Sequence, residues 1–137
     1  MCKALSFIVC ENVQLKIEKL DNGEIVQKPQ IINPLDTITM LSIPSYFSFA
    51  IFGNVTDFDC NKTSGTIYVV IYSPNGSELF KSKEMKLPNF DEQRVGLKFS
   101  FDFRNFTFDS CGEYQVKLFV YDKCIAETQF TVEKRSE

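Results

Sequence analysis

A chain of 137 residues has the length of one ordinary domain and is long enough to bury a hydrophobic core. Its 18 acidic and 15 basic residues give a net charge of -3, which is neither the basic excess of a nucleic-acid-binding surface nor the strong acidity of a DNA mimic. We therefore expect a single domain over residues 1–137 and no nucleic-acid partner.

The first half of the chain alternates apolar and polar residues with the period of a β-strand. Residues 4–10 form an almost continuous apolar run, which predicts a strand covered on both faces. Residues 13–17 alternate apolar and polar side chains and predict a half-buried strand, and Asp-Asn-Gly at 21–23 predicts a hairpin turn. Two further strands are expected over 38–43 and 46–53, and the second of these is apolar on both faces.

The second half of the chain keeps the same period. Residues 66–72 give the strongest strand prediction because all of them are β-branched or aromatic, and Ser-Pro-Asn-Gly at 73–76 predicts the turn that follows. Residues 95–108 place a row of phenylalanines on one face, with a bend or bulge expected at Asn105. A hairpin over 111–132 completes the chain.

The number and spacing of these elements predict the fold class. About nine short strands with turns every 8–12 residues or so indicate an all-β, immunoglobulin-like antiparallel sandwich of about 8–9 strands. Tyr114 stands near the start of the penultimate strand, where such sandwiches place a tyrosine whose hydroxyl bonds back to the backbone. Val116 occupies the position of the antibody cysteine, and the chain has no tryptophan, so an antibody-type disulfide core is not expected.

Three stretches carry a resemblance to a known family: FIVCENV at 7–13, YSPNGSEL at 72–79 and GEYQVKLFVYDKCIAETQFTV at 112–132. They are similar to small, uncharacterised bacterial β-sandwich proteins with a Cys-acid-x-Val strand, a Pro-x-Gly turn and a terminal Gly-x-Tyr hairpin. The usual Gly-Lys hairpin of that family is only partly kept, as Gly23-Glu24. The resemblance implies an immunoglobulin-like fold and a bacterial or phage origin, and it implies no activity.

The cysteines point to the compartment. Their number is odd and they form no close pairs, which predicts five reduced thiols, mostly buried, in a reducing cytosol. The chain start does not read as a signal peptide, and no apolar run reaches transmembrane length, so we expect a cytoplasmic protein without a membrane partner. Four Asn-x-Ser/Thr triplets are interpreted as turn formers rather than glycan acceptors. The cysteines are Cys2, Cys10, Cys60, Cys111 and Cys124, and the triplets begin at Asn54, Asn61, Asn75 and Asn105.

The residues that carry most enzyme chemistry are scarce. The chain has no histidine, and it shows neither a glycine-rich phosphate loop nor a nucleophile elbow, so we expect a non-enzyme without a cofactor. Asp57 and Asp59 alternate in a loop and form a weak alternative calcium site, with Asp109 or Asp122 as further ligands. Their role as turn formers is the favoured interpretation.

The last hairpin supplies the candidate recognition surface. Phe119, Tyr121 and Ile125 are expected on its outer face, opposite the apolar residues that face the core. Large apolar groups on an outer face indicate either a protein interface or a surface covered by the same chain. We interpret the three residues as partner-binding.

Two functions from different classes follow from these observations. The first is a non-catalytic cytosolic protein-interaction module that binds an unidentified protein or a second copy of itself. One form of that function is an inhibitor, encoded by a phage or another mobile element, of a host or defence protein. The alternative is a sensor that binds a small ligand or Ca²⁺ with the loops at one end of the sandwich.

Overall fold

This computed structural model describes residues 2–58, 65–87 and 96–135. Within these residues the secondary structure consists of ten β-strands and no helix. No helix within these ranges has the length and apolar composition needed to cross a bilayer. In chain order the strands are β1 (Lys3–Lys19), β2 (Ile25–Pro34), β3 (Thr37–Met40), β4 (Ser45–Thr56), β5 (Thr66–Tyr72), β6 (Glu78–Lys81), β7 (Met85–Lys86), β8 (Leu97–Phe108), β9 (Gly112–Val120) and β10 (Lys123–Lys134).

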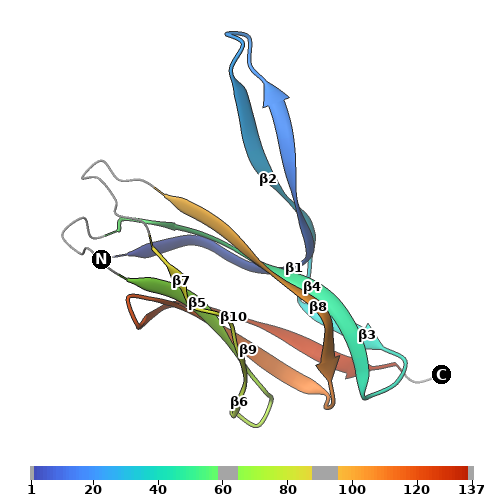
Figure 1. The fold of residues 1–137 in the computed structure, drawn as a ribbon. Helices are drawn as coiled ribbons and strands as arrows, with labels where there is room; N and C mark the ends of the chain where they lie inside the picture. Colours follow the sequence, from blue (N-terminus) through green and yellow to red (C-terminus); the bar gives the residue numbers. More distant parts are fainter. Residues whose placement is uncertain (1, 59–64, 88–95, 136–137) are drawn as a thin grey trace.

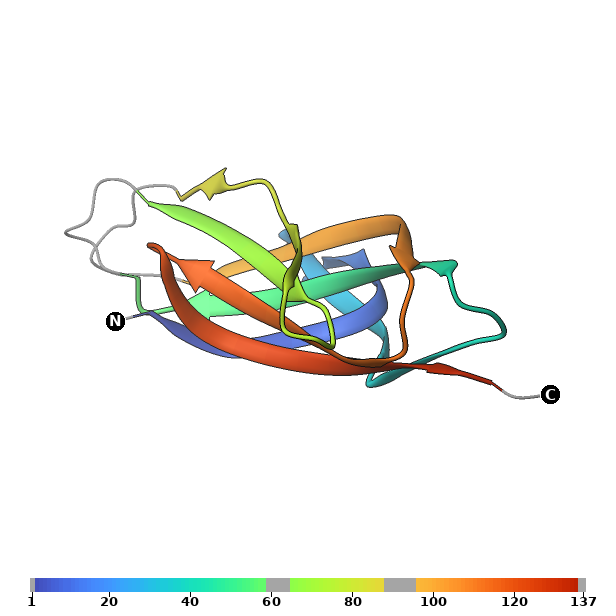
Figure 2. The same cartoon turned by 90° about the horizontal axis from the view of Figure 1, so that it is seen from below.

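The strands form two stacked sheets, seen as two layers in Figure 1 and with one sheet in front of the other in Figure 2. One sheet has the order β2-β1-β4-β8, and the other has the order β3-β10-β9-β5-β6 with β7 beside β5. The β3–β10 pair is parallel, whereas the other pairs are antiparallel. The N-terminal part of the chain thus contributes strands to both sheets, and the predicted immunoglobulin-like sandwich is confirmed.

The core lies between the facing sides of the two sheets. Alternate residues of β9 are buried there because successive side chains of a strand point to opposite faces. On β9 these are Tyr114, Val116, Leu118 and Val120, each no more than 1% exposed. The opposing sheet contributes aromatic rings, of which those of Phe49 and Phe103 stack with their centroids 4.8 Å apart.

Tyr114 forms the predicted tyrosine corner. Its hydroxyl donates a hydrogen bond of 2.7 Å to the carbonyl oxygen of Ser110, in the turn that leads into β9. Its ring is fully buried and stacks on Phe130 of β10, with centroids 5.4 Å apart and planes 6° from parallel. The corner therefore ties the turn between β8 and β9 to the core.

The bulge predicted at Asn105 is also present. Asn105 adopts a positive φ of 51°, and its backbone N–H donates to the Ser48 hydroxyl of β4 over 2.9 Å. The β4–β8 register shifts between Phe47 and Phe49, so an extra residue of β8 is accommodated at this point. Asparagine tolerates this left-handed conformation better than most residues. The Asn-x-Ser/Thr triplet that begins at Asn105 therefore lies at a backbone bend.

Two burial predictions for β1 are wrong. Residues 4–10 were expected to be covered on both faces, but Leu5 is 58% exposed. β1 is a single strand of 17 residues, and its second half pairs only with β2 in a long hairpin that leaves the sandwich (Figure 1). Residues 13–17 were expected to be half-buried, yet Leu15 and Ile17 are each 65% exposed. The cause is that the hairpin projects away from the second sheet, so no facing strand covers it.

The tyrosine corner generates a stability prediction. Tyr114→Phe removes only the hydroxyl that bonds to Ser110, so the free energy of unfolding should fall by about 0.5–1.5 kcal/mol. Tyr46→Phe is the matched control because Tyr46 is 68% exposed, and its effect should stay within about 0.5 kcal/mol. Urea denaturation followed by circular dichroism measures both values. Equal effects of the two substitutions would contradict the role given to the corner.

Candidate functional site

The three residues predicted to bind a partner do not share one face. Phe119 lies on the outer side of β9, where it is half-buried. Tyr121 lies in the turn after β9 with a φ of 53°, and its ring lies so close to Gly65 that a Cβ there would collide with it. Ile125 falls at an irregularity of the β9–β10 ladder between Cys124 and Ala126. Tyr121 and Ile125 both pack against the core. The turn and the register shift thus redirect two of the three side chains.

Phe119 belongs to an aromatic outer face of the second sheet. Its ring stacks on Tyr68 of β5, with centroids 5.1 Å apart and planes 9° from parallel. The ammonium group of Lys81 lies 4.4 Å from the centroid of the Tyr68 ring. Partial burial, followed by the nearby charge of Asp122, raises the pKa of the Tyr68 hydroxyl. On this face, the stacked rings of Phe119 and Tyr68 are therefore flanked by the charged side chains of Lys81 and Asp122.

The alternative calcium site at Asp57 and Asp59 is not formed by the residues that the structure describes. Asp57 follows β4, is exposed and has a φ of 60°, as expected of a turn former, whereas Asp59 lies outside the described residues. The carboxylate of Asp122 accepts a hydrogen bond of 3.5 Å from Tyr68. Among the described residues, no cluster of three or more acidic, cysteine or histidine side chains could hold a metal ion.

The cysteines are less buried than expected. Cys10 is buried, Cys2 is half-buried, and Cys111 and Cys124 are exposed, so the prediction of mostly buried thiols is wrong for these four. Cys60 lies outside the described residues. Cys111 and Cys124 flank turns at the two ends of β9, where neither sheet covers the side chains. The thiols of Cys10, Cys111 and Cys124 are free.

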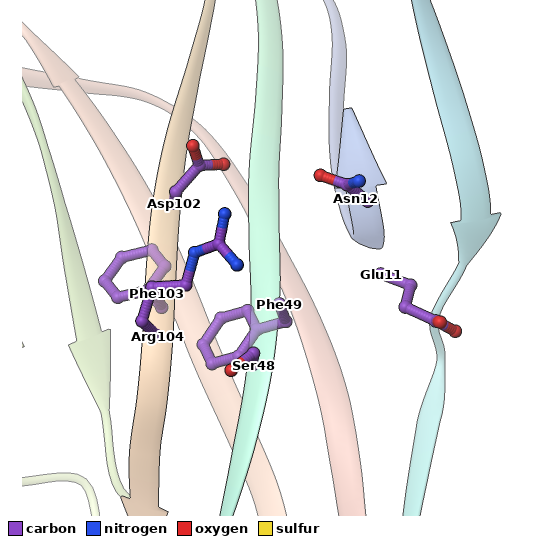
Figure 3. A pocket seen from close by; sticks show the side chains of 7 residues that line it. All are labelled: Glu11, Asn12, Ser48, Phe49, Asp102, Phe103 and Arg104. Atoms are coloured by element: carbon purple, nitrogen blue, oxygen red, sulfur yellow. The ribbon is translucent and has the colours of Figure 1, made fainter. Parts of the chain in front are cut away.

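A polar hollow of about 240 Å³ lies on the outer side of the four-stranded sheet (Figure 3). In Figure 3 the guanidinium of Arg104 extends from β8 towards β4, while the carboxylate of Glu11 points away from it. The Glu11 carboxylate instead accepts a 2.8 Å hydrogen bond from the side-chain amide of Asn33. No ion pair in the described part of the chain joins Arg104 to Asp102 or Glu11. The hollow is lined by Glu11, Asn12, Ser48, Phe49, Asp102, Phe103 and Arg104.

The thiol nearest in sequence to this hollow is poorly suited to nucleophilic chemistry. Burial raises the pKa of the Cys10 thiol; the hydrogen bond with the Asn12 backbone partly offsets this, and the charge of Asp102 adds a smaller increase. The thiol is therefore protonated at neutral pH, whereas the reactive form of cysteine is the thiolate. In the hollow itself, the Ser48 hydroxyl accepts the hydrogen bond of the Asn105 backbone N–H.

The β1–β2 hairpin has one apolar and one polar face. Directly paired residues of an antiparallel ladder share a face, and Val13 pairs with Ile31 and Leu15 with Pro29. We call the side formed by Val13, Leu15, Ile17, Lys19, Ile25, Gln27, Pro29 and Ile31 the apolar hairpin face, although Lys19 and Gln27 are polar members of it. Leu15 and Ile17 are 65% exposed and Ile25 is 69% exposed. The apolar hairpin face is therefore largely open to solvent.

The opposite face of the hairpin is charged and internally paired. The carboxylate of Glu18 lies 3.0 Å from the ammonium of Lys28 and 3.8 Å from that of Lys16. The hydrogen bond and charge of Lys28 lower the pKa of Glu18. The cross-strand contact between Glu18 and Lys28 supports the hairpin on its polar side, whereas the apolar hairpin face has no comparable cover.

A cleft separates the apolar hairpin face from the outer side of β4 and β8. It encloses about 380 Å³, and one wall is the base of the hairpin at Val13 and Leu15. The other wall holds Phe52 of β4 and Lys98 of β8. The complete lining is Val13, Leu15, Gln27, Pro29, Phe52, Lys98, Phe99 and Ser100. Hairpin and cleft thus form one continuous, mainly apolar surface.

The family comparison covers nearly the whole sandwich. Residues 6–133 match the model of a family of unknown function, DUF6941. The chain belongs to DUF6941. The match bears out the resemblance to an uncharacterised β-sandwich family and brings no activity with it. No curated protein matches the chain.

Solved structures show similar folds within larger proteins. The alkylpurine DNA glycosylase AlkC of Pseudomonas fluorescens, bound to DNA with an abasic-site analogue, has a TM-score of 0.52 and 11% identity over 74% of this chain. The β-glucosidase of Listeria innocua has a TM-score of 0.50 and 8% identity over 89% of this chain. The chain spans 28% of the glycosylase and 16% of the glucosidase. At these identities the likeness shows the fold alone.

An immunoglobulin-like protein of Pseudomonas aeruginosa has a similar length. It matches over 93% of this DUF6941 chain and 96% of its own, with 13% identity and a TM-score of 0.35.

The sequence reasoning missed the apolar hairpin face, although a signal for it is present. The alternation over residues 13–17 is followed, after the turn at 20–24, by a strand that contains Pro29. Proline is confined largely to edge strands, so Pro29 indicates that β2 lies at a sheet edge. An edge hairpin with alternating residues has less cover than a central strand with the same pattern.

Thiol exposure generates the next prediction. In the native protein at neutral pH, iodoacetamide should modify Cys111 and Cys124 first, because both thiols are exposed. Cys10 should react only after denaturation, since burial and its raised pKa suppress the thiolate. Intact-mass spectrometry without reductant counts the added groups. Fewer than five reactive thiols after denaturation would contradict the prediction that all five cysteines are reduced.

The metal alternative is tested by thermal melting. If Asp57 acts as a turn former, millimolar calcium should leave the melting temperature unchanged. A calcium site occupied far above its dissociation constant would stabilise the fold by a few kcal/mol. A calcium-dependent rise that is lost in Asp57→Asn would instead support the sensor function, and magnesium at equal ionic strength is the control.

Proposed function

We propose that this DUF6941 protein is a non-catalytic protein-interaction module whose recognition element is the apolar hairpin face. The observation that carries the proposal is the exposure of Leu15, Ile17 and Ile25, each about two-thirds open to solvent on one side of a projecting hairpin. Two-stranded hairpins are marginally stable in water unless a further layer covers them. Contiguous exposed aliphatic groups rimmed by polar residues are typical of protein interfaces.

Several features support a role without catalysis. The chain has no histidine, and the Cys10 thiol has a raised pKa. The glycosylase and glucosidase activities of the structural neighbours are not proposed for this chain, because the likeness covers a minor part of each enzyme at 8–11% identity. Free thiols at Cys111 and Cys124 favour a reducing compartment such as the cytosol.

The physiological role of this DUF6941 protein depends on the identity of the protein that its hairpin binds. A small domain that covers part of a partner's surface can act as an inhibitor, and the role as a phage- or mobile-element-encoded inhibitor of a host or defence protein stays a prediction. The identity of the bound protein tests it. Phe119, stacked on Tyr68, is a second candidate contact on the far sheet, because aromatic residues dominate interface energies.

The proposed function is tested by placing a photo-crosslinking amino acid on each side of the hairpin in the native host. Probes at Leu15 and Ile17 should yield a covalent adduct with a protein chain, whereas probes at Gln14 and Lys16 on the polar face should not. Mass spectrometry identifies the chain in the adduct. The identified chain, when purified, should bind the wild type and lose at least tenfold in affinity for Leu15→Ser/Ile17→Ser.

The matched control is Gln14→Ser/Lys16→Ser, which alters the polar face of the same strand. This variant and Leu15→Ser/Ile17→Ser should both melt within a few degrees of the wild type, because residues 14–17 lie outside the core. Equal crosslinking from both faces, or no adduct from either, would contradict the proposed function.

A further inference from the structure

The free edge of β2 is poorly suited to the addition of a strand. β2 is the outer strand of its sheet and contains Pro29 and Pro34, neither of which has a backbone N–H. Prolines and lysines in edge strands are a common protection against edge-to-edge pairing, and Lys28 adds a charge beside Pro29. A partner therefore has to pack on the apolar hairpin face rather than extend the sheet.

We propose that the occupant of the apolar hairpin face is a second copy of this chain, packed face to face and antiparallel about a two-fold axis. This inference rests on the proposed function, since it names the partner of the same surface. Each copy would place its hairpin against the hairpin and cleft of the other. A two-fold interface uses the same patch on both subunits, and here one continuous patch supplies both the projection and the cleft.

Charges at the two ends of the hairpin agree with the antiparallel arrangement. The tip carries Asp21 and Glu24 beside the turn, with Lys19 next to them on the apolar hairpin face, and Lys98 lines the cleft at the base. Asp21, Glu24 and Lys98 take part in no ion pair between residues that the structure describes. From Val13 to Lys19 the strand extends roughly 20 Å at about 3.3 Å per residue, so antiparallel packing over that length brings each acidic tip to the Lys98 of the other copy.

The size of the combined surface also fits a dimer. Two-fold packing buries the hairpin and the opposite cleft wall of each copy at the same time. Alternate residues over 13–19 and 25–31 lie on the interface side of the hairpin, and the turn at 20–24 adds its tip. With Phe52, Lys98, Phe99 and Ser100 of the cleft wall they supply about 17 residues per copy, close to the lower end of a standard protein interface. A hairpin covered only by a short peptide would leave most of this surface open.

The test is the oligomeric state of the full-length chain by analytical ultracentrifugation. The wild type should sediment as a dimer of twice 15.8 kDa at micromolar concentration. Lys98→Glu should weaken self-association, and so should Asp21→Lys/Glu24→Lys, because each places like charges opposite each other twice per dimer. Tenfold weakening corresponds to 1.4 kcal/mol. Lys123→Glu, an exposed charge reversal on the other sheet, should leave the dimer unchanged.

Mixing the two charge variants provides the discriminating measurement. A heterodimer of Lys98→Glu with Asp21→Lys/Glu24→Lys has opposite charges at both ends of the interface, so the mixture should dimerise at a concentration at which each variant alone is mainly monomeric. Thermal melts of the separate variants confirm that both are folded. A wild type that stays monomeric, a dimer insensitive to Leu15→Ser/Ile17→Ser, or a mixture without recovery would overturn the inference.

The outcome for the proposed function is read separately from the crosslinks. A monomeric wild type with a different protein crosslinked at Leu15 overturns the second-copy inference and leaves the proposed function standing. A monomeric wild type without any adduct at Leu15 overturns both.

Discussion

The structure depends on aromatic rings that lock the two sheets together. Phe108 at the end of β8 contacts Tyr114 of β9 at 5.2 Å between centroids, and Tyr114 stacks on Phe130 of β10. Phe49 of β4 completes the cluster, 5.7 Å from Phe130. Because β1 pairs with β4, this cluster also anchors the strand from which the hairpin emerges. Aromatic rings from four strands, which belong to both sheets, therefore fix how the two sheets pack against each other.

The same architecture explains why the hairpin is open. The second sheet covers β1 as far as Val9, which is 2% exposed, but it does not follow β1 into the hairpin. Beyond that point β1 has β2 on one side, while the cleft separates it from β4 and β8. The apolar hairpin face is thus half of a sandwich without its opposing layer. A second layer supplied by another chain would complete the same type of packing that stabilises the rest of the domain.

Local patterns predicted the features that depend on local chemistry. The turn at 73–76 forms with a φ of 88° at Gly76, and the bulge forms at Asn105, because both depend on residues that tolerate positive φ. Tyr114 was located from its position relative to the last hairpin. Phe119, Tyr121 and Ile125 do not share one face, because the turn conformation at Tyr121 and the register shift beside Ile125 redirect both side chains. Such adjustments result from strand pairing over distance, which alternation does not record.

The contrast between two strands shows where sequence information ends. The row Val13, Leu15, Ile17 alternates as regularly as Val116, Leu118, Val120, yet the second row is buried and the first is largely exposed. Alternation identifies the residues that share a face, since the side chains of a strand point to opposite sides in turn. It does not say whether another layer lies against that face. Burial is a property of the space around a strand, and only the arrangement of both sheets left the hairpin without a covering layer.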